Sequence, residues 1–325
     1  MPTAVNDGIK TRYEVVGSEP RSQFGFPASI PTPKLDTEEP RLKHSHPISR
    51  LLLASYFVTV AASAALAQTV KESYEPVEGQ AGKDVVWVPT PPVLVEKMLD
   101  MARVTPRDYV MDLGSGDGRN IIAAAKRGAR ALGVEWNHDM VELSRRVAAK
   151  EGVADRAAFV QGDMYEADVS QATVLALFLL TENLNKMVPK FLEMKPGSRI
   201  VVNGFEIDEW KFDETGRAEG ECDSWCTAYL YIVPAKVAGT WRLRGGRLVL
   251  EQKFQQITGT LTANGTTSPI ANGRLHGDTI RFTVSGVEYS GRVTGNRMSG
   301  DLKGSATGVW TAKRKTERLR VSQRQ

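Results

Sequence analysis

The stretch "DLGSGDGRN", Asp112 to Asn120, places three glycines at alternate positions in a short segment. It follows the apolar run Tyr109-Val110-Met111 and precedes the apolar run 121–125. A buried strand, a glycine-rich turn and a helix in this order are typical of a sheet that binds a nucleotide-like ligand at its carboxyl edge. The segment therefore predicts an α/β fold and raises the question of which ligand the loop cradles.

The charges in this loop favour a ligand that is cationic at one end. A phosphate-binding loop offers backbone N–H groups with a Lys and a hydroxyl, whereas this one carries Asp117 and is preceded by Asp112. Carboxylates repel phosphate but suit S-adenosylmethionine, which has an ammonium and a sulfonium. An NAD enzyme is the main competitor, yet its G-x-G-x-x-G spacing is replaced here by G-x-G-x-G.

Two further strand ends carry acidic residues. Glu135 lies about twenty residues past the loop, where an acidic side chain accepts hydrogen bonds from both ribose hydroxyls. The next predicted strand ends in "VQGDM", which places Asp163 beside the adenine as a hydrogen-bond acceptor and Met164 as an apolar wall. Together the three strand ends support S-adenosylmethionine more strongly than a glycine motif alone.

Strands and helices alternate between residues 87 and 236. We expect a helix over 91–102, with Thr90 as its N-cap and Pro91 in its first turn. We expect strands at 109–112, 131–135, 157–160, 173–179, 199–203 and 228–233. This alternation predicts a mostly parallel sheet with helices on both faces.

Residues 239–315 have a different texture, with short alternating stretches separated by turn pairs such as Asn264-Gly265. They predict a small all-β meander or half-barrel, in which Trp241 and Trp310 pair the first and last strands around an aromatic plug. Gly239–Gln325, including a basic tail at 316–325, carries 15 Lys and Arg against 5 Asp and Glu, a net charge of +10. Whether this module recruits a substrate, binds the cell envelope or only packs is left open.

The N-terminal region is predicted to be disordered over residues 1–50. An uncharged apolar run, 51–67, follows Arg41, Lys43 and Arg50 and ends in Ala65-Leu66-Ala67, which is the pattern of a secretory signal. An uncleaved membrane anchor is the alternative, and residues 68–86 are a linker. We expect an exported protein, periplasmic or associated with the membrane or envelope; a cytoplasmic location is the alternative, because the inferred cofactor is made in the cytoplasm.

Four segments resemble a known family. They are "WVPTPPVLVEKMLDMARVTPRDYVMDLGSGDGR", "GVADRAAFVQGDM", "ATVLALFLLTENLNKMVPKFLEMKPGSRIVV" and "FEIDEW", which together run from Trp87 to about Val233. They are similar to class I methyltransferases that include archaeal broad-specificity and mitochondrial protein-lysine methyltransferases. The resemblance implies a seven-stranded Rossmann-like sheet, S-adenosylmethionine as cofactor and a protein lysine as acceptor. It departs from these relatives at Val202-Asn203-Gly204, where they tend to have Ser-His-Glu.

The candidate site residues combine these arguments with that resemblance. The expected cofactor-binding residues are Thr90, Asp112, Gly114, Gly116, Asp117, Gly118, Glu135, Trp136, Asp163 and Met164. The expected acceptor channel comprises Trp87, Leu179, Leu180, Thr181, Asn183 and Phe205, with Glu206 and Trp210 at its rim. Trp87 either faces an ammonium or simply packs on the first helix. No catalytic base, metal or nucleic-acid partner is expected.

Cys222 and Cys226 are the only cysteines. Two thiols are too few for a zinc site without other ligands. In an exported protein they can form a disulfide if the backbone turns between them, and otherwise they are buried small hydrophobes.

Three functions stay open at this point. The first is a protein-lysine methyltransferase, the second a small-molecule methyltransferase, and the third an exported binding protein whose methyltransferase-like domain has no turnover. The sequence does not choose the acceptor or the oligomeric state.

Overall fold

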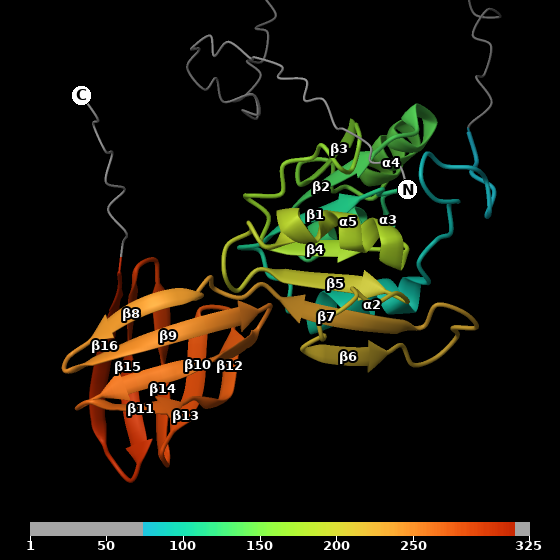
Figure 1. Cartoon of the computed structure of the whole chain (residues 1–325). Helices are drawn as coiled ribbons and strands as arrows, with labels where there is room; N and C mark the ends of the chain where they lie inside the picture. Colours follow the sequence, from blue (N-terminus) through green and yellow to red (C-terminus); the bar gives the residue numbers. More distant parts are fainter. Residues whose placement is uncertain (1–73, 316–325) are drawn as a thin grey trace, which may run out of the picture. The chain divides into compact units, whose positions relative to one another are not determined.

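The computed structural model describes residues 74–315, which contain two sheets (Figure 1). The first sheet has seven strands in the order β3-β2-β1-β4-β5-β7-β6. Their bounds are β1 Tyr109–Leu113, β2 Arg130–Glu135, β3 Ala157–Gln161, β4 Val174–Leu177, β5 Arg199–Asn203, β6 Glu214–Arg217 and β7 Thr227–Ile232. Strands β1 to β5 pair in parallel, and β7 pairs antiparallel with both β5 and β6. The strand order reverses between β1 and β4, the point where such sheets bind ligands.

Helices cover both faces of this sheet (Figure 1). They are α2 Pro92–Met101, α3 Arg119–Lys126, α4 His138–Lys150 and α5 Thr181–Phe191. Neighbouring strand residues point to opposite faces, so Val110 packs in one core with α2, α3 and α4, while Met111 packs in the other with α5. The predicted α/β architecture is confirmed.

Most expected element bounds agree with the structure to within one or two residues, with three informative exceptions. The first helix begins at Pro92, with Pro91 in an extended conformation as its N-cap and no side-chain cap. The prediction that Thr90 caps this helix is therefore wrong. The strand expected at 173–179 ends at Leu177, because Phe178 to Leu180 leave the sheet to enter α5. Strand β6 was not predicted, since its sequence "ETGR" is short, polar and largely exposed.

The second sheet is an antiparallel ring. Its strands are β8 Gly239–Leu243, β9 Gly246–Lys253, β10 Gln256–Ala263, β11 Thr266–Pro269, β12 Ala271–His276, β13 Thr279–Val284, β14 Val287–Thr294, β15 Arg297–Gly304 and β16 Gly308–Arg314. The order runs from β10 through β12 to β16, β8 and β9, and β9 pairs back with β10. The first and last strands, β8 and β16, pair as predicted.

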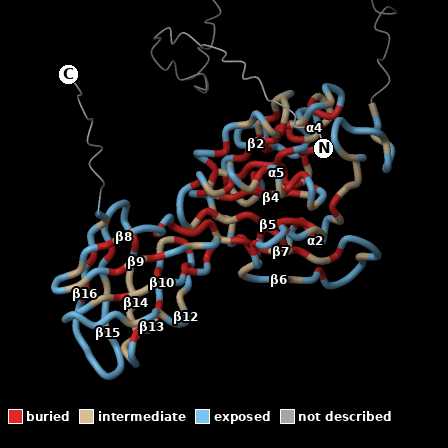
Figure 2. The backbone as a smooth tube through the Cα atoms, viewed as in Figure 1, coloured by how far each residue is buried: buried red, intermediate tan, exposed pale blue. Residues whose placement is uncertain are grey.

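The interior of this ring is aromatic and aliphatic. Trp241 and Trp310 are both buried, and each indole N–H donates to a backbone carbonyl, of Val237 and Ser290 respectively. Figure 2 shows buried and exposed residues alternating along these strands, as expected when one face of a sheet is packed. The predicted all-β module is confirmed.

Side chains of the segment that follows β5 contact the all-β module. The rings of Trp210 and Phe254 stack with centroids 5.0 Å apart, and Arg274 donates to Asp213 over 2.8 Å. Buried Gln255 donates a hydrogen bond to the carbonyl of Lys211. Trp210 is only 1% exposed, so the expectation that it lies at the rim of a channel is wrong.

The terminal predictions fall on residues 1–73 and 316–325. The disordered extension, the apolar run 51–67 and the basic tail lie outside the described residues. Among the residues that are described, no helix has the length and apolarity needed to cross a membrane.

Candidate active site

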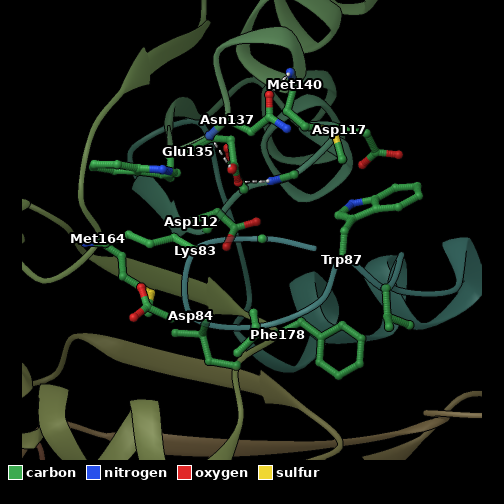
Figure 3. A pocket seen from close by; sticks show the side chains of 18 of the residues that line it. Lys83, Asp84, Trp87, Asp112, Asp117, Glu135, Asn137, Met140, Met164 and Phe178 are labelled. Atoms are coloured by element: carbon green, nitrogen blue, oxygen red, sulfur yellow. Dashed lines mark hydrogen bonds between the residues drawn. The ribbon is translucent and has the colours of Figure 1, made fainter. Parts of the chain in front are cut away.

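A cleft of about 890 Å³ opens at the carboxyl edge of the sheet (Figure 3). This volume falls in the range of about 300–1,000 Å³ typical of small-molecule sites. Nine of the ten predicted cofactor residues line it: Thr90, Asp112, Gly114, Gly116, Asp117, Glu135, Trp136, Asp163 and Met164. The remaining one, Gly118, begins α3 and lies against Phe159 and Ser144 instead, so its small size serves helix packing.

The glycine loop is held open by its backbone conformation. Gly114, Gly116 and Gly118 all have positive φ, between 54° and 81°, a region that residues with a Cβ rarely adopt. A Cβ on Gly116 would lie 2.6 Å from Nε1 of Trp87. The loop and the indole therefore form a close-fitting cradle that a side chain at Gly116 would fill.

Asp112 is the polar centre of the cleft. Its Oδ2 accepts a hydrogen bond of 3.0 Å from the amide of Asn120, while its Oδ1 is buried without a partner. Burial raises the pKa of Asp112 to about 7, and the nearby charges of Glu135 and Asp117 act in the same direction. An unpartnered buried carboxylate oxygen is a position where a ligand ammonium would be stabilised.

The other two acidic residues of this part of the cleft already have partners. The Glu135 carboxylate accepts hydrogen bonds from the backbone N–H of Gly116 at 2.9 Å and of Asn137 at 2.8 Å. Asp117 forms an ion pair with Arg119, whose guanidinium also donates to the Thr90 carbonyl over 2.6 Å. Asp117 thus fixes the loop to the entry of α2, and Asp112 keeps the free oxygen.

A lysine that the sequence analysis missed crosses the far side of the cleft. Lys83 forms an ion pair with Asp163, and its ammonium lies 4.5 Å from the centre of the Trp136 ring. The hydrogen bond between the pair raises the pKa of Lys83 and lowers the pKa of Asp163. Lys83 follows no motif in the sequence, and it lies 80 positions from Asp163, so no local signal indicated this contact.

Thr90 and Asn203 connect the cleft with the end of β5. Both side chains are buried, and the Asn203 amide donates to the Thr90 hydroxyl over 3.2 Å. Asn203 Oδ1 is buried without a partner. Thr90 therefore lies at the boundary between the cleft and the segment that departs from the family pattern.

The predicted channel residues divide into two groups. Trp87 and Leu179 line the cleft itself, together with Phe178. The other predicted channel residues lie outside that lining. Leu180 is 44% exposed at the start of α5, and the Thr181 hydroxyl donates to the Glu206 carbonyl over 3.0 Å, which joins the ends of β4 and β5. Asn183 is buried and donates to the hydroxyl of Tyr165 over 2.7 Å.

An aromatic cluster beside the cleft includes Phe205, as predicted, and two residues that the sequence analysis did not choose. Trp225 has its ring centre 5.1 Å from that of Phe205 and 5.6 Å from that of Phe178. The loop that carries Trp225 is closed by a disulfide between Cys222 and Cys226. The backbone turns between the two cysteines, which is the condition under which the sequence allowed a disulfide.

The fold and the cleft define a class I, S-adenosylmethionine-dependent methyltransferase. Residues 112–214 match the family model described as "ANTKMT methyltransferase domain". The chain is 44% identical over 154 residues to a protein-lysine N-methyltransferase of Saccharolobus islandicus (strain REY15A), covering 46% of this chain and 94% of that one. It is 33% identical over 162 residues to an ATP synthase lysine N-methyltransferase of Mus musculus, covering 50% of this chain and 61% of that one.

The chain belongs to the family of these lysine methyltransferases. Among solved structures it is similar to an RNA methyltransferase from Salinibacter ruber in complex with S-adenosyl-L-homocysteine. That match has 41% identity and a TM-score of 0.43, over 46% of this chain and 96% of that one. The cofactor inferred from the glycine loop is thereby confirmed as S-adenosylmethionine, and the NAD alternative is excluded.

Proposed function

We propose that this chain methylates lysine side chains of proteins. The observation that supports this most directly is the position of an apolar wall, Phe178, Leu179 and Leu180, next to the cleft that contains Asp112. The names of the relatives, which are lysine methyltransferases, point to the same acceptor.

The residues of the cleft fit S-adenosylmethionine. The unpartnered Asp112 Oδ1 would accept from its ammonium, Glu135 from its ribose, and Asp163 from its adenine, while the glycine loop leaves room for close backbone approach. When bound, the cofactor supplies a methyl group on a sulfonium. The protein's own contribution is to hold the two reactants in line, which is worth several kcal/mol in general.

The acceptor must enter as a neutral amine. A free lysine has a pKa of about 10.4, and an apolar channel disfavours the charged form and lowers that value. The wall formed by Phe178 and Leu179 can therefore prepare the amine by desolvation. The nitrogen then forms a bond to the methyl carbon as the carbon–sulfur bond breaks, and the proton of the new ammonium leaves to solvent.

The acceptor class can be tested by incubating the purified protein with S-adenosylmethionine labelled in its methyl group. Cell-envelope protein, total lipid, small metabolites and total RNA serve as separate acceptor fractions, and Asp112→Ala is the inactive control. The proposal expects label in protein, released as methyl-lysine after acid hydrolysis. Label in lipid or metabolites alone would favour a small-molecule methyltransferase, label in RNA alone would move the acceptor to nucleic acid, and no transfer despite cofactor binding would indicate a binding protein.

We also propose that the chain acts outside the cytoplasm. The apolar run at 51–67 with its preceding basic residues supports export, and so does the pairing of the only two cysteines in a disulfide, which persists best in oxidising compartments. A reporter that fluoresces only in the cytoplasm, fused after residue 80, should stay dark. Bright cells would contradict export.

A further inference from the structure

The loop between β6 and β7 brings a tryptophan to the acceptor side of the cleft. Trp225 is 41% exposed, and its partners Phe178 and Phe205 follow β4 and β5 directly. Because β7 runs antiparallel to β5, the start of β7 lies at the same sheet edge as the ends of β4 and β5. The three rings therefore form one surface at the edge where Phe178 lines the cleft.

The backbone around this surface is adapted to the indole. Trp225 has a φ of 55°, an unfavourable conformation for a bulky residue, which is kept only where the surroundings enforce it. Gly204 has a φ of 71°, and a Cβ there would lie 2.8 Å from Cε3 of Trp225 and 3.8 Å from Cε2 of Phe178. Gly204, in the segment that departs from the family pattern, thus provides the space that Trp225 occupies.

The disulfide fixes the position of this tryptophan. Cys226, next in the chain, is buried, and its carbonyl accepts from the Ala218 N–H over 2.8 Å. The bond to Cys222 closes a five-residue loop, "CDSWC", on that anchored residue. Loop closure by a covalent bond lowers the number of conformations that Trp225 can adopt.

The surroundings of the rings suit a cation. Glu206 follows Phe205, and Glu221 and Asp223 flank Cys222; all three acidic residues are exposed. Aromatic faces attract ammonium groups, and nearby carboxylates add long-range attraction without a fixed partner. A lysine side chain, with an apolar stem and a cationic end, has both of the required features.

We propose that Trp225, together with Phe178 and Phe205, is the surface that receives the acceptor lysine, and that the Cys222–Cys226 disulfide makes this reception dependent on oxidation. The proposal rests on the proposed function and adds the residues that determine acceptor binding. Reduction by a dithiol breaks the Sγ–Sγ bond, adds two electrons and two protons, and leaves two thiols while the dithiol becomes a disulfide. The freed loop then no longer holds Trp225 against Gly204, and the acceptor binds more weakly.

The test measures cofactor affinity and acceptor kinetics separately on the full chain, with the protein fraction that accepts label as the substrate. Trp225→Ala should raise KM for the acceptor by about three- to thirty-fold, the range expected for cation–π contacts, and leave the calorimetric affinity for S-adenosylmethionine unchanged. Trp225→Phe should restore most of the effect. Val309→Ala, at a position 80% exposed on β16, is the control for a surface apolar residue and should have no effect.

Dithiothreitol and the double variant Cys222→Ala/Cys226→Ala test the role of the disulfide. Each should raise KM in the wild-type background and have little further effect on Trp225→Ala, since both act through the same ring. Wild-type KM in Trp225→Ala would overturn the aromatic surface, and equal effects of reduction with and without Trp225 would overturn its link to the disulfide. Absence of transfer to protein lysine by the wild type would instead contradict the proposed function, so the two failures are distinct.

Discussion

The two sides of the cleft are built differently. The cofactor side consists of residues that directly follow β1, β2 and β3, such as Asp112, Glu135 and Asp163. The acceptor side combines the ends of β4 and β5 with a disulfide loop that precedes β7, a strand that lies beside β5 only through the sheet order. The cofactor side is therefore a property of local sequence, while the acceptor side is a property of topology, and changes on one side should leave the other largely intact.

The largest effect is expected from Gly116→Val. Its side chain would meet the Trp87 indole, where even a Cβ lies only 2.6 Å away, and would fill the cradle, so cofactor binding should be abolished in calorimetry. Gly152→Val is the matched control, because Gly152 also has a positive φ, 69°, but has no atom within 4 Å of the added Cβ. Equal affinity in both variants would contradict the assignment of the loop.

Asp112 should make cofactor binding depend on pH. With a pKa of about 7 in the absence of ligand, its carboxyl must lose a proton to accept the ammonium. Affinity should rise as the pH increases through about 7 and then level off, approaching tenfold per unit on the acidic side. Calorimetry between pH 5.5 and 8.5 checks this, and Asp112→Asn should bind weakly with no such slope. A flat profile for the wild type would show that Asp112 does not pair with the ammonium.

The same residue should affect stability with the opposite sign. The folded pKa of Asp112 lies above its unfolded value of about 3.9, so the folded state binds more protons between those pH values. Its contribution is fully present below about pH 4 and is lost as the pH rises through about 7. Chemical denaturation should show that wild type loses more stability than Asp112→Asn over this range, and a saturating cofactor should reduce the difference.

Phe254→Ala tests whether the all-β module supports the acceptor side. Phe254 stacks on Trp210, in the segment that also carries Phe205 and Glu206. Partial loss of this contact should lower the free energy of unfolding by about 1–3 kcal/mol, less than the ~3–5 kcal/mol typical of a fully buried Phe. We expect acceptor KM to rise and cofactor affinity to stay unchanged. A loss of cofactor affinity alone would contradict the separation of the two sides.

The smallest effect is expected from Lys83→Ala. Lys83 occupies Asp163 and the face of Trp136, which are the groups assigned to the adenine, but an exposed ion pair contributes little. Removing it should raise cofactor affinity by no more than about threefold, with Lys303→Ala in the all-β module as the surface control. A strong decrease in affinity would mean that Lys83 helps to close the cleft over the cofactor.

The sequence predicted the cofactor side well for a physical reason. Each polar residue follows an apolar strand, and parallel strands bring their carboxyl ends to one edge, so spacing along the chain is enough to place Asp112, Glu135 and Asp163 together. The pairing of Asp117 with Arg119 and the contact of Lys83 were missed, because side-chain conformations decide them.

The acceptor side was predicted less completely. Phe205 and Leu179 were found, but Trp225 lies in a loop of uncertain conformation whose position depends on a disulfide that the sequence only allowed. Trp210 was misplaced because its burial depends on Phe254 in a separately folded sheet. Contacts between elements that are distant in sequence leave no periodic signal from which they could be predicted.

Peptide mass spectrometry on labelled product tests the central claim most directly. The wild type, Trp225→Ala and Asp112→Ala are incubated with S-adenosylmethionine carrying a deuterated methyl group and envelope protein, and the modified residues are located by fragmentation. The account predicts deuterated methyl on lysine side chains with the wild type, less with Trp225→Ala at limiting acceptor, and none with Asp112→Ala. Deuterated methyl on other residues only, or none on protein at all, would contradict it.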